Sequence, residues 1–174
     1  LSSEVFRRAL KEPAQILVIG PAPGLNAVAE MCRGEMVFQG GFLPYHLYRP
    51  KNVLPQFEGK ASMPTFNFNG CRPAVDALSK APLSLRRFCG KNVCHGIKLT
   101  KDHQFAPARG VAGEIYLEAV RLYFSRHEEK KMHDPTALVC HLHPEIAEWY
   151  RGTPQRLKDG WTTVPGDDYV LADV

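Results

Sequence analysis

The triplet His133-Asp134-Pro135 carries the residue types in this sequence that are best suited to chemistry near neutral pH. A histidine imidazole titrates close to neutrality, and a neighbouring carboxylate can bind a hard cation. The pair is therefore a candidate acid and metal ligand. A structural alternative also stands, in which Asp134 caps a helix that Pro135 begins, a common arrangement at helix N-termini.

Two asparagines form a second candidate group. Asn67 and Asn69 alternate with phenylalanines in the segment Pro64–Gly70. A carboxamide both donates and accepts hydrogen bonds, which suits a polyhydroxylated ligand such as a sugar. Asn before Gly is equally typical of a turn, so both interpretations remain open.

Short apolar runs bounded by Gly and Pro predict the strands that must position these residues. One strand is predicted at 16–19 and another at 35–38, with a helical segment at 25–32 between them. Strand, helix and strand in succession form a parallel crossover unit. The sequence therefore predicts a single α/β domain over residues 1–174, with an open, mostly parallel sheet flanked by helices. Ligands of such sheets bind beyond the carboxyl ends of the strands, which favours the loops after Ile19 and Phe38.

The rest of the chain mixes irregular and helical segments. Residues 42–69 are irregular, and their many aromatic side chains predict an ordered binding loop. The other predicted elements are helices over 72–80, 112–131 and 135–142, a strand at either 87–89 or 92–94, and a hairpin of strands 161–164 and 169–172. In the longest helix, Ile115, Ala119 and Leu122 are spaced for one buried face.

Composition excludes several classes of protein. Among 174 residues, 44% are hydrophobic and 23% charged, which is typical of globular domains rather than of disordered or fibrous chains. No apolar run approaches the roughly 20 residues of a membrane span. The net charge of +4 forms no basic stripe, so a nucleic-acid partner is disfavoured and an RNA-binding module is the weakest hypothesis. Five cysteines, an odd number, indicate free and mostly buried thiols in a reducing intracellular compartment, the cytoplasm or an organelle matrix.

Four segments, in the same order along the chain, resemble the inosine-uridine preferring nucleoside hydrolase family. Leu17–Pro21 is similar to the family's strand ending in Gly-Pro-Leu-Thr-Asn, and Val37–Gly41 to its next strand, ending in Met-Gly-Gly. Phe66-Asn67 is similar to its Glu-Phe-Asn, and His133-Asp134-Pro135 to its His-Asp-Pro ahead of a helix. The resemblance covers the C-terminal half to two-thirds of a family member.

The resemblance implies an activity and roles for individual residues. Family members hydrolyse the N-glycosidic bond of ribonucleosides, a step of purine and pyrimidine salvage, with a bound calcium ion. By resemblance, Asp134 is expected to bind Ca²⁺, together with the backbone carbonyl of Ile19. Asn67 is expected to bind the ribose, and His133 to protonate the departing base.

The chain also departs from the family pattern. The family's N-terminal cluster, roughly Asp-x-Asp-x-x-x-Asp-Asp, supplies most calcium ligands and the general base, and residues 1–15 contain no aspartate. Thr65 stands where the family has a ribose-binding Glu, and Cys71 where it has an Asp. Calcium takes about six to eight oxygen ligands, so one carboxylate and one carbonyl cannot hold it firmly.

Two functions follow from these matches and departures. The chain is expected to be either part of a nucleoside hydrolase or a catalytically inactive, hydrolase-like structural subunit of a larger assembly. In the first case a missing N-terminal segment, or a second chain, completes the site. In both cases we expect a partner over the exposed sheet edge, an oligomer, and no catalysis by this chain alone.

Overall fold

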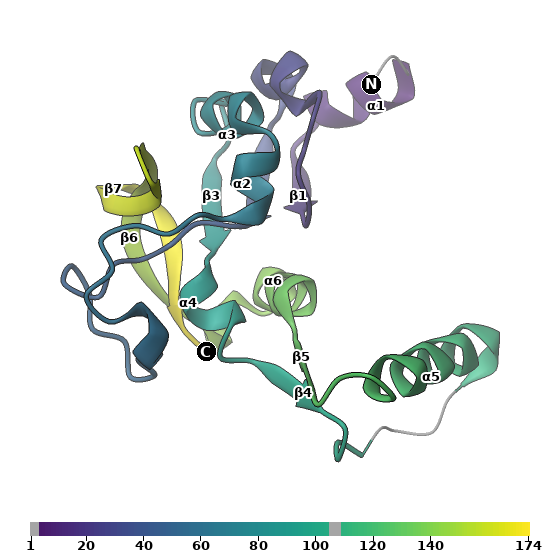
Figure 1. The fold of residues 1–174 in the computed structure, drawn as a ribbon. Coiled ribbons are helices and arrows are strands. Elements are labelled where there is room, and N and C mark those ends of the chain that lie inside the picture. Colours follow the sequence, from purple (N-terminus) through teal and green to yellow (C-terminus); the bar gives the residue numbers. More distant parts are fainter. Residues whose placement is uncertain (1–3, 105–108) are drawn as a thin grey trace.

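A five-stranded sheet forms the centre of the protein, with the strand order β1-β2-β3-β7-β6 (Figure 1). The computed structural model describes residues 4–104 and 109–174. The first four strands of this order run parallel, and β6 pairs with β7 in the antiparallel sense. The strands are β1 (Ala14–Val18), β2 (Gly34–Gln39), β3 (Leu85–Cys89), β6 (Glu148–Leu157) and β7 (Gly160–Asp173). The predicted α/β class with an open, mostly parallel sheet is therefore confirmed.

Helices flank the sheet, and a second sheet of two antiparallel strands lies to one side (Figure 1). The α-helices are α1 (Glu4–Lys11), α2 (Phe66–Gly70), α3 (Arg72–Leu78), α4 (Lys91–Cys94), α5 (Gly110–Phe124) and α6 (His133–Leu142). The small sheet pairs β4 (Lys98–Thr100) with β5 (Glu129–Lys131). The 3₁₀ turns are η1 (Leu25–Ala27), η2 (Ala29–Met31), η3 (Pro55–Phe57) and η4 (Pro144–Ile146). Among the described helices, none is long and apolar enough to cross a membrane.

Alternate residues of each parallel strand point to opposite faces of the sheet, as the pleat requires. Phe38 and Phe88 pack with Phe68 of α2 and with Trp161, and we call this side the aromatic face. Val37 and Leu171 point the other way, against three buried cysteines and Ala137, and we call that side the thiol face. Helices α2 and α3 and the η1–η2 turns cover the aromatic face, whereas α4 and α6 cover the thiol face.

The long irregular segment after β2 is anchored to the sheet, in agreement with the predicted ordered loop. The Asn92 side chain forms two hydrogen bonds with the backbone of Leu43, each 2.7 Å long. Thr163 Oγ1 donates to the carbonyl of Phe42 at 2.8 Å, and the Phe42 and Phe57 rings lie 5.5 Å apart. The hydrogen bonds to Asn92 and Thr163 tie the loop to α4 and β7, and the Phe42–Phe57 contact packs the loop on itself, so the loop is part of the fold.

The predicted hairpin of strands 161–164 and 169–172 is wrong. Both runs belong to the single strand β7, whose partner is β6. The residues between them, 165–168, bulge from the ladder at a register shift opposite Arg151. Asp168, expected in an exposed turn, is buried and accepts a hydrogen bond from Arg86 Nε at 2.6 Å. A partner on another strand therefore holds this charged residue inside the sheet.

Helix boundaries and exposure also differ from prediction. The predicted helix over 112–131 ends at Phe124, because Glu129–Lys131 pairs as β5. Its expected buried face is wrong: Ile115 is 65% and Leu122 57% exposed. Helix α5 has no buried residue and extends away from the main sheet beyond β4 and β5 (Figure 1). The helix predicted over 25–32 forms the turns η1 and η2, and of the two alternatives for the third strand, 87–89 lies in β3 while 92–94 is helical.

Candidate functional site

The N-terminus of α6 holds the strongest sequence candidates. The helix begins at His133, with Met132 as its N-cap residue. Met132 is fixed by its backbone N–H, which donates to the carbonyl of Ile97 at 3.0 Å, and by its carbonyl, which accepts from Thr136 Oγ1. Asp134 is exposed in the first turn, and no side-chain capping hydrogen bond forms at this terminus. The alternative explanation of Asp134 as a helix cap is therefore wrong.

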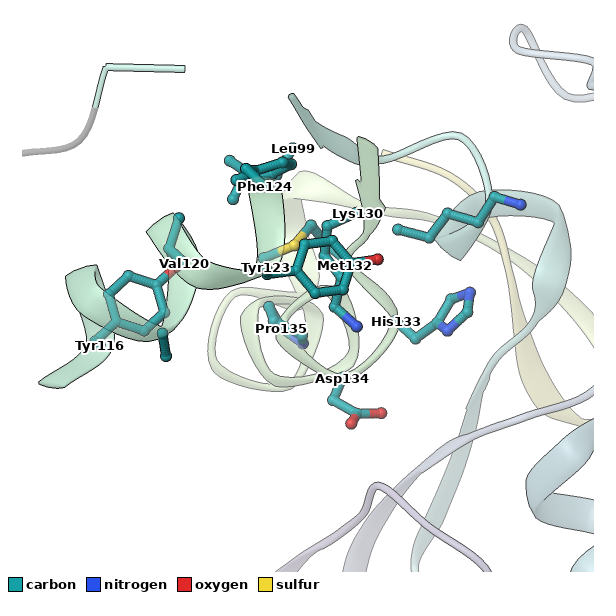
Figure 2. A pocket seen from close by; sticks show the side chains of 12 residues that line it. Leu99, Tyr116, Val120, Tyr123, Phe124, Lys130, Met132, His133, Asp134 and Pro135 are labelled. Atoms are coloured by element: carbon teal, nitrogen blue, oxygen red, sulfur yellow. The ribbon is translucent and has the colours of Figure 1, made fainter. Parts of the chain in front are cut away.

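A pocket of about 350 Å³ lies between this terminus, α5 and the small sheet (Figure 2). Its walls are mostly apolar, with aromatic rings from α5 on one side and the first turn of α6 on the other. The lining includes Leu99, Tyr116, Val120, Tyr123, Phe124, Lys130, Met132, His133, Asp134 and Pro135. Aromatic walls with a few polar groups at one end are typical of sites for small planar ligands.

His133 lines the pocket, and its half-buried imidazole is directed away from the rings of α5 (Figure 2). Its Nε2 atom is buried and has no hydrogen-bond partner among the described residues. Its ring lies 5.1 Å from that of His95. Burial lowers the pKa of His133, and nearby lysines lower it further, while the Asp134 carboxylate opposes them. The imidazole is therefore neutral at pH 7 and gains a proton only in more acid solution.

Asn67 is buried in α2 and has a fixed orientation. Its Nδ2 donates both to the backbone carbonyl of Gln39, at 2.8 Å, and to Gln39 Oε1, at 2.6 Å. The Gln39 side chain also interacts with the Cys94 thiol, whose pKa it lowers against the larger effect of burial. That thiol in turn lies 3.8 Å from the carbonyl of His133. A chain of polar contacts therefore runs from Asn67 to the start of α6.

The predicted site residues lie along one edge of the sheet. Val18 of β1 pairs in register with Phe38, and Gln39 with Cys89, so the three strands end side by side. Ile19 is exposed directly after β1, beside the end of β2. Among the described residues, no hydrogen bond or ion pair joins Asn67 to Asp134. The structure places Ile19 and the partner of Asn67, Gln39, at the carboxyl ends of β1 and β2, and it leaves the predicted residues as separate groups.

Comparison with known proteins identifies the fold. No family model and no curated protein sequence matches the chain. Among solved structures, a plant nucleoside hydrolase, the PpNRh1 enzyme, matches with a TM-score of 0.53 and 20% sequence identity. The chain has a nucleoside-hydrolase-like fold. The match covers 90% of this chain and 49% of the plant enzyme, so the chain spans about half the length of that protein.

In this nucleoside-hydrolase-like half, the residues present do not by themselves fit a calcium ion. Asp134 offers one carboxylate and Ile19 one carbonyl, against the roughly six to eight oxygen ligands that calcium takes. Within residues 4–104 and 109–174, no three His, Cys, Asp or Glu side chains are grouped so that they could hold a metal ion. The charged neighbours of His133 are the Asp134 carboxylate, which raises its pKa, and the lysines Lys91, Lys130 and Lys131, which lower it.

Sequence reasoning missed four residues of the site. Gln39 holds Asn67 by a hydrogen bond. The feature of the sequence that could have indicated it is a polar residue at the end of a buried strand. His95 lies beside His133 but follows a short helix that carries no motif. Tyr116 and Tyr123 are seven residues apart, a spacing that places both on one side of a helix and could have indicated the aromatic wall.

Proposed function

We propose that this chain forms the base-binding side of a ribonucleoside hydrolase site, which becomes active when further polypeptide completes it. The observation that carries the proposal is the unpartnered His133 Nε2 beside an aromatic pocket, at the carboxyl edge of a nucleoside-hydrolase-like sheet. The resemblance of four sequence segments to the inosine-uridine preferring family supports inosine and uridine as substrates.

The pocket suits the leaving group of this reaction. Water adds to the anomeric carbon as the N-glycosidic bond breaks, and the departing base must gain a proton. The rings of Tyr116 and Tyr123 offer flat apolar surfaces for a planar heterocycle. His133, at the end of the same pocket, would donate the proton to the base. Because its pKa is lowered, we expect this step to be favoured in mildly acid solution.

Asn67 suits a role in holding the ribose. Within the described part of the chain, both hydrogen bonds of the Asn67 side chain use Nδ2, which leaves the side-chain oxygen as the group available to a ligand. A carboxamide oxygen accepts hydrogen bonds, so it would accept from a sugar hydroxyl. The two hydrogen bonds to Gln39 keep the Asn67 amide from flipping, so its nitrogen stays toward Gln39 and its oxygen stays available.

The missing part of the site would lie along β1. This strand is at the edge of the sheet, where unpaired backbone groups favour the addition of another strand. A largely apolar groove of about 430 Å³ follows β1 and continues to Pro21 and Leu25. We propose that a further segment, on this polypeptide or on a partner, adds a parallel strand there. Acidic residues at its carboxyl end would join Asp134 and the Ile19 carbonyl in a calcium site.

A structural, non-catalytic role is the second candidate, and Thr65 favours it. This residue stands where the resembled family has a ribose-binding Glu. It is buried, and its Oγ1 has no hydrogen-bond partner among the described residues. A hydroxyl cannot replace a carboxylate as a charged hydrogen-bond acceptor. In this alternative the chain keeps the fold and packs in a larger assembly without turnover.

The test uses the natural polypeptide or assembly that contains this chain. We expect it to release base from inosine or uridine, and a calcium chelator to abolish that release. A His133→Gln variant should lower the rate at least about a hundredfold, the usual contribution of a general acid. The matched control is His143→Gln, at the other end of α6 and exposed. An assembly that binds no calcium and leaves both nucleosides intact would refute the enzyme and favour the structural role.

A further inference from the structure

Three of the five cysteines lie together on the thiol face. Cys89 ends β3, Cys94 ends α4 and Cys140 lies in the last turn of α6, and all three are buried in one cluster. A strand and two helices, β3, α4 and α6, therefore each contribute one thiol to the same buried cluster. The proposed hydrolysis uses none of these thiols as a reacting group.

Within the cluster, Cys89 and Cys140 are direct partners. The two side chains belong to the same buried cluster and interact, since each shifts the pKa of the other. The interaction with Cys89 lowers the pKa of Cys140 against the opposing effect of burial, and the interaction with Cys140, together with burial, holds the pKa of Cys89 well above its usual range. Cys140 is therefore the thiol more readily ionised, and Cys89 is the protonated thiol beside it.

The third thiol is less suited to ionise. Burial raises the pKa of Cys94 to about 12. Its Sγ atom also lies 3.8 Å from the carbonyls of both Cys89 and His133, to which it donates. These contacts stabilise the protonated thiol, so Cys94 is a poorer nucleophile than Cys140.

A surface pocket leads to Cys140. The pocket has a volume of about 230 Å³ and lies beside the outer part of α6. Its other lining residues are almost entirely apolar: Ile97, Met132, Pro135, Thr136, Val139, Ile146 and Val174. A small neutral oxidant such as hydrogen peroxide fits such a space, whereas bulky or charged reagents would be excluded.

We propose that Cys89 and Cys140 form a reversible disulfide when hydrogen peroxide reaches Cys140 through this pocket. The Cys140 thiolate attacks one peroxide oxygen, the O–O bond breaks, hydroxide leaves and a sulfenic acid forms. The Cys89 sulfur then attacks the sulfenic sulfur, and its proton leaves with the hydroxyl group as water. Two thiols are oxidised, one peroxide is reduced to water, and a dithiol reductant reverses the bond.

The disulfide would join β3 to α6 and close a loop from residue 89 to residue 140. That loop contains α4, β4, α5 and β5, the elements around the candidate site. A cross-link across so long a loop restricts the unfolded chain. We therefore expect the oxidised protein to unfold at a higher temperature than the reduced protein.

Peptide mapping of the purified chain tests the proposal. After brief exposure to hydrogen peroxide, free thiols are alkylated under denaturing conditions and the digest is analysed without reduction. We expect the peptide with Cys89 to be joined to the peptide with Cys140, and dithiothreitol to separate them. In Cys89→Ser the reaction should stop at Cys140 sulfenic acid, which dimedone captures and mass spectrometry detects.

The control is Cys32, a buried thiol on the aromatic face whose pKa burial raises. Cys32→Ser should leave the cross-link unchanged, and Cys32 should be oxidised at least about tenfold more slowly than Cys140. Full alkylation of Cys89 and Cys140 after peroxide would overturn the proposal. So would a cross-link through Cys94 in place of Cys89. Neither result depends on nucleoside hydrolysis, so this test is independent of the proposed function.

Discussion

The two faces of the central sheet are built in different ways. On the aromatic face, Phe68 touches three other rings, with centroids 5.0 Å from Phe38, 6.0 Å from Phe88 and 4.9 Å from Trp161. On the thiol face the core consists mainly of cysteines and small aliphatic side chains. Helix α6 covers that core but exposes Leu142 and other apolar residues on its outer side. One face is closed by its own helices, and the other ends in uncovered apolar surface.

The candidate site lies on the less complete side. The His133 imidazole, the aromatic pocket and the pocket beside Cys140 all belong to α6 or to elements next to it. Contiguous exposed apolar surface marks places where proteins bind ligands or one another. The aromatic face thus supplies the tightly packed ring cluster, while the thiol face carries the pocket beside His133 and the pocket beside Cys140. The proposed function also draws on Asn67 of α2 and on the groove along β1, which lie toward the aromatic face.

The largest expected effect tests the aromatic face. Phe68→Ala removes the ring at the centre of the cluster and leaves a cavity, so we expect a loss of about 3–5 kcal/mol in the free energy of unfolding. Phe66→Ala is the matched control, because Phe66 lies in the same helix and is 81% exposed. It should change the stability by less than about 0.5 kcal/mol. Urea titration measures the free energy of unfolding of both variants. Equal losses would mean that the buried ring cluster does not carry the stability assigned to the aromatic face.

The sequence predicts the sheet well because its signals are local. Met36, Val37 and Phe38 form a short apolar run, and strands of this kind are recognisable without knowing their neighbours. The hairpin prediction failed because Asp168 pairs with Arg86, a residue far away in the sequence. The prediction of a buried face on α5 failed for a related reason. Apolar spacing shows that a helix has an apolar face, but it does not show that another element covers that face.

The candidate site could be predicted only in part, because short motifs are local whereas the contacts that support them are not. Short motifs pointed to His133, Asp134, Asn67 and Ile19, and of these Ile19 directly follows β1 while His133 and Asp134 begin α6. The roles assigned to these residues stay predictions. The supporting contacts are tertiary, since Gln39 meets Asn67 across 28 positions of sequence. No local pattern encodes such a pair.

A pH titration of stability gives a smaller effect, confined to the thiol face. Burial, then Lys91 and His133, lower the pKa of His95 from 6.5 to about 4. Between these two values the unfolded chain binds a proton that the folded chain does not, so stability falls as pH falls. His95 is only half buried, which reduces the effect. We expect a loss of about 1 kcal/mol between pH 7 and pH 5.

Variants of two histidines separate this effect from general acid unfolding. His95→Gln removes one of two histidines with lowered pKa values and should reduce the slope of the stability profile between pH 7 and pH 5, the remainder coming from His133. His143→Gln, in an exposed position, should leave the profile of the original protein unchanged. Chemical denaturation at each pH supplies the measurement. If His95→Gln keeps the full pH dependence, the cationic surroundings of the site do not act through His95.

The smallest expected change in stability tests the uncovered side of α6. Leu138→Gln and Leu142→Gln replace exposed apolar side chains by another good helix former, so each should change the free energy of unfolding by less than about 0.5 kcal/mol. The same substitution at Leu78, buried in α3 on the aromatic face, should cost several times more because it buries an amide. The two α6 variants should also bind less hydrophobic dye and self-associate less. A loss above about 2 kcal/mol at Leu142 would mean that the outer side of α6 is already packed, because only buried apolar groups carry such costs.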